Sequence, residues 1–152
     1  GLGDVYKRQI KTSGGVNNNG DRHVCYAFCE KKGYSKFGTF KGNGSTDGTF
    51  VYTGFKPAWL MIKRTDADSK NWYVADSGRS PSNITKAFLS PNLSNAEDTS
   101  GDTSNAYFDI LSNGFKMRQD FSHLNASGST QMYIAFAEHP FVSSKGVPVT
   151  AR

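Results

Sequence analysis

The sequence predicts an all-β fold, an antiparallel β-sandwich of about eight or nine short strands with a jelly-roll or lectin-like topology. Aromatic residues make up 13% of the chain, and 16 glycines are interspersed with many Asn, Ser and Thr residues. This mixture is typical of short strands joined by tight turns. Because no segment shows a convincing amphipathic helical period, two packed antiparallel sheets are the natural way to bury the apolar faces of these strands.

Length and charge restrict the classes of protein to which the chain can belong. Its 152 residues suit one domain of ordinary size. The net charge is +5, from 18 Lys and Arg against 13 Asp and Glu, with the basic residues spread along the chain. We expect no nucleic-acid partner, which would require a basic stripe or a known binding motif. We also expect no membrane insertion and no signal peptide, because the sequence lacks apolar runs of either kind.

The first predicted strands follow from alternating apolar residues at 24–29, 36–41 and 50–53. The segment 42–48 (GNGSTDG) is rich in glycine, but it lacks the Lys and Ser/Thr of a phosphate-binding loop, and a strand rather than a helix follows it. It is therefore interpreted as a loop between strands.

A nearly continuous apolar run at 58–64 (AWLMIKR) predicts a central strand that is covered on both faces. Pro57 marks its entry, where a missing N–H is tolerable. The polar turn at 65–71 then leads to a return strand at 72–76. Residues 77–105 are the least regular part of the chain, with one short apolar patch.

Residues 107–119 (YFDILSNGFKMRQ) predict a β-hairpin, because Asn-Gly is the preferred pair for a two-residue type I′ turn. Counting outward from Asn113-Gly114, the predicted cross-strand pairs are Ser112–Phe115, Leu111–Lys116, Ile110–Met117 and Asp109–Arg118. This register places Phe108, Ile110, Phe115 and Met117 on one face. It also places the charges of Asp109 and Arg118 opposite each other. The last predicted strand is 132–138.

An internal repeat relates the two ends of the chain. IKTSGG (10–15) and VCYAFCE (24–30) resemble LNASGS (124–129) and MYIAFAE (132–138). In both copies a Ser-Gly turn precedes a strand that ends Ala-Phe-small-Glu. We interpret this similarity as a tandem repeat, the alternative being two similar strands by chance.

The repeat predicts the domain boundaries. Residues 10–30 would be the tail of a preceding repeat, 31–141 the β-sandwich domain, and 142–152 a C-terminal tail or linker. Within residues 1–9, DVYKRQ resembles the translation of a transposon end used in preparing sequencing libraries. We therefore expect residues 1–9 to be a non-native artefact.

Cys25 and Cys29 are the only cysteines of the chain. On one strand, four residues at about 3.3 Å each would separate them by roughly 13 Å, whereas a disulfide needs Cα atoms within about 7 Å. Two free thiols on one face of a strand are expected. Without a C-x-x-C motif or a matching pair of histidines, no zinc site is predicted.

No motif in the sequence indicates catalysis, a cofactor or a metal. No G-x-S-x-G occurs, and His23, His123 and His139 each stand alone beside turn residues. DADSKN (66–71) begins like a calcium loop, but it lacks the later Gly and the terminal Glu. Acidic pairs suitable for glycoside hydrolysis are not a specific signal in a chain with 13 acidic residues. We expect a protein that is not an enzyme and holds no cofactor.

Four aromatic residues beside polar residues and turns are the candidate ligand-binding residues: Tyr34, Tyr52, Trp72 and Tyr73. Exposed rings of this kind can stack on sugars while neighbouring polar side chains bind the hydroxyl groups. Aromatic residues on strands are also frequent in cores and cross-strand pairs, so both interpretations stay open for these four. Trp59, inside the apolar run, is assigned to the core.

Four sequence blocks resemble, in the same order, an uncharacterised domain of marine bacteriophage structural and tail-associated proteins. The blocks are GYSKFGTFKGNGSTDGTFVYTGFKPAWLMIKRTD (33–66), PNLSNAE (91–97), DILSNGFKMR (109–118) and NASGSTQMYIAFAEHPF (125–141). The resemblance implies a β-rich virion component whose units occur in tandem, with no established catalytic residues. The chain departs from the pattern in its longer VNNNGDR segment and in Lys31-Lys32.

The expected function is that of a non-catalytic virion module in a tail fibre or another adhesion-associated appendage. It would present aromatic-bearing loops to a host-surface glycan, and repetition or homo-oligomerisation would add avidity. Its partners would be other virion proteins and that glycan, and it would be found in the phage particle, assembled in the host cytoplasm. A purely structural spacer and a less favoured depolymerase-type enzyme are the alternatives.

Overall fold

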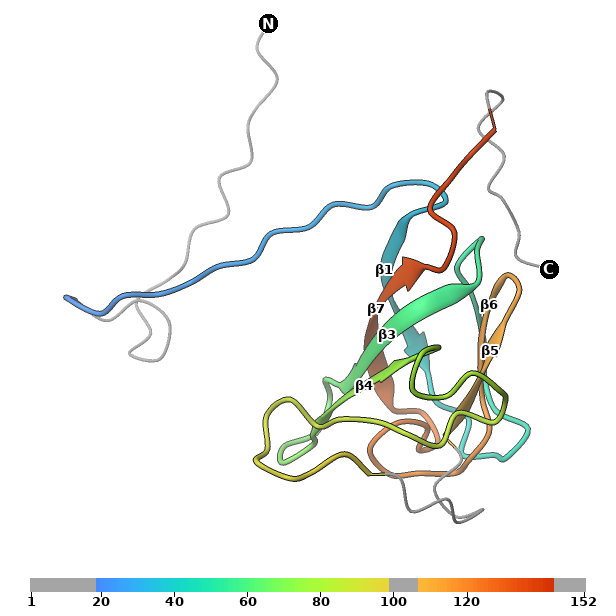
Figure 1. Cartoon of the computed structure of the whole chain (residues 1–152). Coiled ribbons are helices and arrows are strands. Elements are labelled where there is room, and N and C mark those ends of the chain that lie inside the picture. Colours follow the sequence, from blue (N-terminus) through green and yellow to red (C-terminus); the bar gives the residue numbers. More distant parts are fainter. Residues whose placement is uncertain (1–18, 99–106, 144–152) are drawn as a thin grey trace, which may run out of the picture.

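The computed structural model describes residues 19–98 and 107–143, which form seven strands and no helix. The strands are β1 (Ser35–Lys41), β2 (Phe50–Tyr52), β3 (Pro57–Arg64), β4 (Trp72–Asp76), β5 (Phe108–Leu111), β6 (Gly114–Met117) and β7 (Thr130–Ala137). All pairings are antiparallel, in a four-stranded sheet of order β1-β7-β3-β4 and a three-stranded sheet of order β2-β6-β5 (Figure 1). The predicted all-β sandwich is confirmed.

One expected strand is not a strand of this domain. Residues 24–29 are extended, but they pair with neither sheet. The apolar patch at 87–89 forms only isolated bridges, from Phe88 to Asp98 and from Leu89 to Val74. The expected artefact at 1–9 and most of the C-terminal tail lie outside the described residues. No described segment could cross a membrane as a helix.

The predicted central strand is confirmed, because β3 lies between β7 and β4. Only one of its faces is fully covered, however. Leu60 and Ile62 are completely buried against the three-stranded sheet, whereas Trp59 and Met61 are half-buried on the opposite side. Assigning Trp59 to the core was therefore wrong: once Leu60 and Ile62 take the inward side, the period of two sends Trp59 outward.

The core is built from the inward faces of both sheets. The rings of Phe40, Phe115 and Tyr133 meet at centroid separations of 5.5–6.4 Å, which joins β1, β6 and β7. At the other end of the sandwich, Tyr73 and Tyr107 belong to a second aromatic group, with centroids 6.0 Å apart. Burial raises the pKa of Tyr107 to about 12, and the nearby Tyr73 adds to the shift.

The predicted hairpin exists, but its register is shifted. The observed pairs are Phe108–Met117, Asp109–Lys116, Ile110–Phe115 and Leu111–Gly114, so the turn residues are Ser112 and Asn113. The predicted inward face is nevertheless confirmed, since its four apolar side chains are all buried. Arg118 still reaches the Asp109 carboxylate, with an N–O separation of 3.3 Å.

Gly114 explains the shifted register. It pairs with both Leu111 and Tyr52, which places it inside the three-stranded sheet rather than at the tip of the turn. A Cβ atom at this position would lie 2.1 Å from the carbonyl oxygen of Val51. The glycine therefore permits close approach of two strands, and its backbone does not have the positive φ of a type I′ turn.

Asn125 ties the loop after β1 to the segment before β7. Its side chain is fully buried. The amide nitrogen lies 2.9–3.1 Å from the oxygen atoms of Asn43 (Oδ1), Ser45 and Gln119, while its Oδ1 accepts the N–H of Asn43 at 3.2 Å. The main-chain oxygen of Asn125 also accepts the N–H of Gly44. One fully buried amide thus holds the two segments together, with both its nitrogen and its oxygen bonded.

The segment between β4 and β5 closes one side of the sandwich. At the edge of β4, Val74 and Leu89 exchange two backbone hydrogen bonds of 2.8 and 2.9 Å. At the edge of β5, the Asn83 amide bonds both the N–H and the C=O of Ile110, at 2.9 and 2.8 Å. These contacts pair the edges that would otherwise present free backbone groups. The side where β1 and β2 are the edge strands has no such cover among the described residues.

Replacing Gly114 by alanine should destabilise the domain by about 1–3 kcal/mol or more, because the new methyl group must push β2 away from β6. Urea denaturation measures the change as a lower midpoint. Gly78→Ala is the matched control, since a Cβ there meets only a side-chain oxygen of Asp76, at 3.1 Å. Equal midpoints for the two variants would contradict this account of Gly114.

Asn125→Asp should lower the free energy of unfolding by about 3–5 kcal/mol, as expected for a buried charge without a partner. The change is isosteric, but it turns the donor that faces three oxygen atoms into an acceptor. Asn95→Asp, in an exposed loop, should change the stability by no more than about 0.5 kcal/mol. Urea denaturation at neutral pH compares the two, and an unchanged Asn125→Asp protein would refute the proposed role of the amide.

The stability of the domain should fall as the pH rises from about 10 to 12. The unfolded phenol titrates near 10, whereas folded Tyr107 keeps its proton until about 12, so the contribution is complete below pH 10 and is lost above it. Tyr107→Phe should flatten this dependence without abolishing it, because burial also raises the pKa of Tyr73 and of Tyr133. Urea denaturation at stepped pH gives the slope, and an unchanged slope in the variant would contradict the assignment.

Candidate ligand-binding groove

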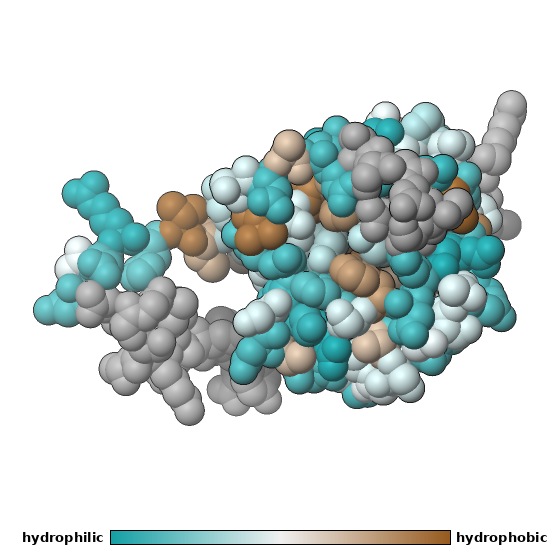
Figure 2. All heavy atoms as spheres, turned by 90° about the horizontal axis from the view of Figure 1, so that it is seen from below, coloured by the Kyte–Doolittle hydropathy of each residue, from teal (hydrophilic) through white to brown (hydrophobic). Residues whose placement is uncertain are grey.

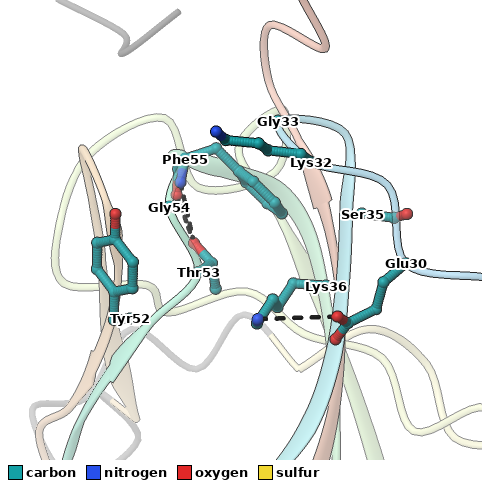
Figure 3. Close-up of a pocket in the computed structure, with 9 residues that line it drawn as sticks. All are labelled: Glu30, Lys32, Gly33, Ser35, Lys36, Tyr52, Thr53, Gly54 and Phe55. Carbon is teal, nitrogen blue, oxygen red and sulfur yellow. Dashed lines mark hydrogen bonds and ion pairs between the residues drawn. The ribbon is translucent and has the colours of Figure 1, made fainter. Parts of the chain in front are cut away.

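A groove of about 540 Å³ opens where the edges of β1 and β2 separate (Figure 3). It is lined by Glu30, Lys32, Gly33, Ser35, Lys36, Tyr52, Thr53, Gly54 and Phe55. This is the uncovered side of the sandwich, opposite the segment that bonds the edges of β4 and β5. A volume of this size lies within the range of small-molecule sites in proteins.

Tyr52 forms one wall of the groove. Its ring stands apart from the opposite side chains in Figure 3, and 64% of the residue is exposed. Beyond it, the N–H groups of Thr53 and Gly54 both bond the carbonyl of Asn113 at 3.0 and 3.1 Å, which fixes this segment to the tip of the hairpin. Gly54 has a φ of 84°, and the turn that it allows directs Phe55 into the interior, where the residue is 2% exposed.

The opposite wall carries charge. Glu30 Oε2 lies 3.8 Å from Lys36 Nζ, and Glu30 Oε1 accepts the backbone N–H of Phe37 at 3.0 Å. Both side chains of the pair are about half exposed, so the pair itself contributes little stability. Ser35 holds the turn below it by donating to the carbonyl of Cys29 and accepting from the N–H of Lys31.

The groove therefore offers an exposed aromatic ring on one side and a loosely held acid and base on the other. A polar molecule of modest size can stack on the ring while its hydroxyl groups bond the carboxylate and the ammonium group. Because the weak ion pair can exchange partners at low cost, these two groups are available to a ligand.

Three of the four predicted ligand-binding residues are not groove residues. Tyr34 is 45% exposed, but its ring packs edge-on against Phe136, at 5.9 Å, on the outer face of the four-stranded sheet. Tyr73 is 7% exposed and contacts the rings of Phe88, Tyr107, Phe121 and His123 inside the sandwich. Its ring is not open to a ligand from solvent, because its position on β4 is inward, like that of Ala75.

Trp72 lies at a separate place. It lines a shallow hollow of about 280 Å³ with Met61, Pro91 and Asn92. Its backbone N–H donates to Asn92 Oδ1 at 2.9 Å, and Lys63 Nζ lies 5.6 Å from the centre of its ring. The structure thus brings none of the four predicted aromatic residues together, and only Tyr52 belongs to the larger groove.

Trp72 is part of a larger apolar surface on the outside of the four-stranded sheet, here called the outer patch. Its residues are half-buried, apart from the buried Val74, and they are Phe37, Trp59, Met61, Trp72, Val74, Met132, Ile134 and Phe136. The pairing registers place Phe37, Ile134, Met61 and Val74 in one row across all four strands. The outer face of an antiparallel sheet in a sandwich is usually polar, so this surface is a second feature that calls for an explanation.

Sequence reasoning missed the charged wall of the groove. One signal was present: Lys36, Gly38 and Phe40 lie on the same face of β1, and Phe40 is a core residue. A lysine on the inward face of a strand indicates that the two sheets separate at that end. Glu30 gave no comparable signal, because it precedes the domain proper in the repeat.

Among residues 19–98 and 107–143, no three His, Cys, Asp or Glu side chains lie close enough to hold a metal ion. Cys25 and Cys29 are free, as expected, but they are exposed on a segment that is not a strand of either sheet. His123 packs against Phe121 with the rings 4.9 Å apart, and burial together with Lys70 lowers its pKa.

Comparison with known proteins gave one match. The profile of a family described as a domain of unknown function, DUF7483, matches residues 4–140. The searches of curated proteins and of solved structures returned no match. The matched range includes the segment before β1 as well as all seven strands. The chain therefore belongs to the DUF7483 family.

Proposed function

We propose that this domain is a non-catalytic binding module that holds a glycan of a cell surface in the groove between β1 and β2. The observation that carries the proposal is the position of Tyr52, an exposed ring that faces an acid and a base across an open groove. A sugar ring has an apolar face for stacking and a rim of hydroxyl groups for polar side chains, and the two walls are complementary to these two features.

The proposal extends to the setting in which the module works. The resemblance of its four sequence blocks to bacteriophage structural domains supports a place in a virion appendage such as a tail fibre. A single open groove of this kind binds weakly, because it encloses little of its ligand. In an appendage with many copies, several weak contacts to one host surface would add through avidity.

A purely structural spacer is the second candidate, and the outer patch favours it. Its apolar side chains suit packing against another protein of an assembly more than contact with a sugar. Exposed apolar surfaces on a rigid domain commonly mark such interfaces. Under this alternative the groove would have no ligand.

Tyr52→Ala should weaken glycan binding about tenfold or more, the loss expected on removing a central aromatic contact worth upwards of 1.4 kcal/mol. A glycan array with the whole chain identifies the ligand, and a titration compares the variants. Tyr52→Phe keeps the ring and should bind nearly as well as the parent. Tyr26→Ala is the matched control, because Tyr26 is 80% exposed on a different segment and should change nothing. If the parent protein binds no glycan, the proposed binding function is refuted and the structural spacer is the remaining candidate.

A further inference from the structure

Residues 19–30 form an arm that runs away from the sandwich in an extended conformation (Figure 1). Val24 and Tyr26 are each 80% exposed, and Phe28 is 62% exposed. Figure 2 shows hydrophobic side chains on the arm between its hydrophilic tip and the body of the domain. Three large apolar side chains in alternate positions, with no sheet to receive them, are unusual on a folded surface.

The arm is fixed only at its base. Glu30 bonds the edge of β1, Cys29 accepts a hydrogen bond from Ser35, and the Phe28 ring lies 5.7 Å from that of Phe136. Residues 24–27 make no backbone hydrogen bond with the described part of the domain. The arm is therefore held in place without belonging to either sheet.

The arm and β7 match without a gap. VNNNGDRHVCYAFCE (16–30) aligns with LNASGSTQMYIAFAE (124–138), which pairs Gly20 with Gly128. Both glycines have positive φ values, 87° and 71°, so they make the same kind of turn at the same distance before the two strands. This alignment replaces the pairing of IKTSGG with LNASGS, and it removes the supposed insertion.

The two faces of the arm correspond to the two faces of β7. In β7 the buried Tyr133 and Ala135 point into the core, while Met132, Ile134 and Phe136 are half-buried on the outer patch. In the aligned arm, Cys25, Ala27 and Cys29 take the inward positions. The larger Val24, Tyr26 and Phe28 take the outward ones. The arm thus has the pattern of a strand with a small-residue face for a tight core and a large-residue face for the outer patch.

We infer that residues 24–30 are the seventh strand of a second copy of this fold, which precedes this domain in a longer chain. A finished copy already holds its own β7 between β1 and β3, so it has no place for the arm. Only a copy whose chain continues directly into the arm lacks that strand. The Phe28–Phe136 contact is then the joint, at which equivalent residues of consecutive copies touch.

The inference is tested with the whole chain preceded by a copy of its own residues 31–129. This front copy contains β1 to β6 and can be completed only by the arm. The chain has two cysteines, both on the arm and both exposed, so thiol labelling reports directly on whether the arm is seated. A second tandem chain carries Cys25→Tyr, which gives the front copy the aromatic ring that Tyr133 supplies to the core of the rear copy. In this chain the labelling rate is measured at Cys29.

We expect Cys25 to be labelled rapidly in the single chain and at least tenfold more slowly in the tandem chain, with the front copy resistant to protease. Ala27→Asp places a charge on the inward face and should restore rapid labelling, while the rear copy stays folded as an internal control. Tyr26→Asp, on the outward face, should keep the protection. If both tandem chains label as fast as the single chain and their front copy is digested, the inference is overturned.

Discussion

The position of β7 is the constraint on which the rest of the structure depends. This strand pairs with β1 along one edge and with β3 along the other, and so joins the beginning of the domain to its middle. Its inward side chains complete the core, and Tyr133 contacts Phe40 and Phe115 from two other strands. Glu138, directly after β7, forms an ion pair of 2.9 Å with Lys56, the residue directly before β3. Without this strand, β1 would have no partner within its sheet.

The groove follows from how the two sheets meet at their edges. On one side, the segment between β4 and β5 bonds the edges of both strands and closes the sandwich. On the other side, β1 and β2 are consecutive in sequence but belong to different sheets, and their edges separate around Phe55. An open side with one aromatic wall and one charged wall is therefore a product of the strand order. The same strand order leaves the outer patch as a second surface, on the far side of the four-stranded sheet.

Alternation along the chain predicted most of the fold, because a period of two reports which side of a strand is buried. It correctly grouped the inward side chains of the hairpin and located β1, β3, β4 and β7. It failed where a residue had two physical explanations. Gly114 fits a type I′ turn and a close approach of strands equally well, and only the pairing with β2 decides between them. For the adjacent aromatic residues Trp72 and Tyr73 both the exposed and the core interpretation stayed open, although neighbours on a strand must face opposite ways. The charged wall of the groove depends on the meeting of two sheets, which no local pattern contains.

The place of β7 also determines when the fold can be completed. The strand is the last of the seven along the chain, yet its partner β1 is the first, so the four-stranded sheet closes only through contacts that are distant in sequence. Such contacts form slowly, because the intervening chain must be ordered before they are gained. During synthesis from the N-terminus, β1 to β6 must wait for β7 to leave the ribosome. In a row of such units, each would fold as the chain enters the next, and the row would mature in the order in which it is made.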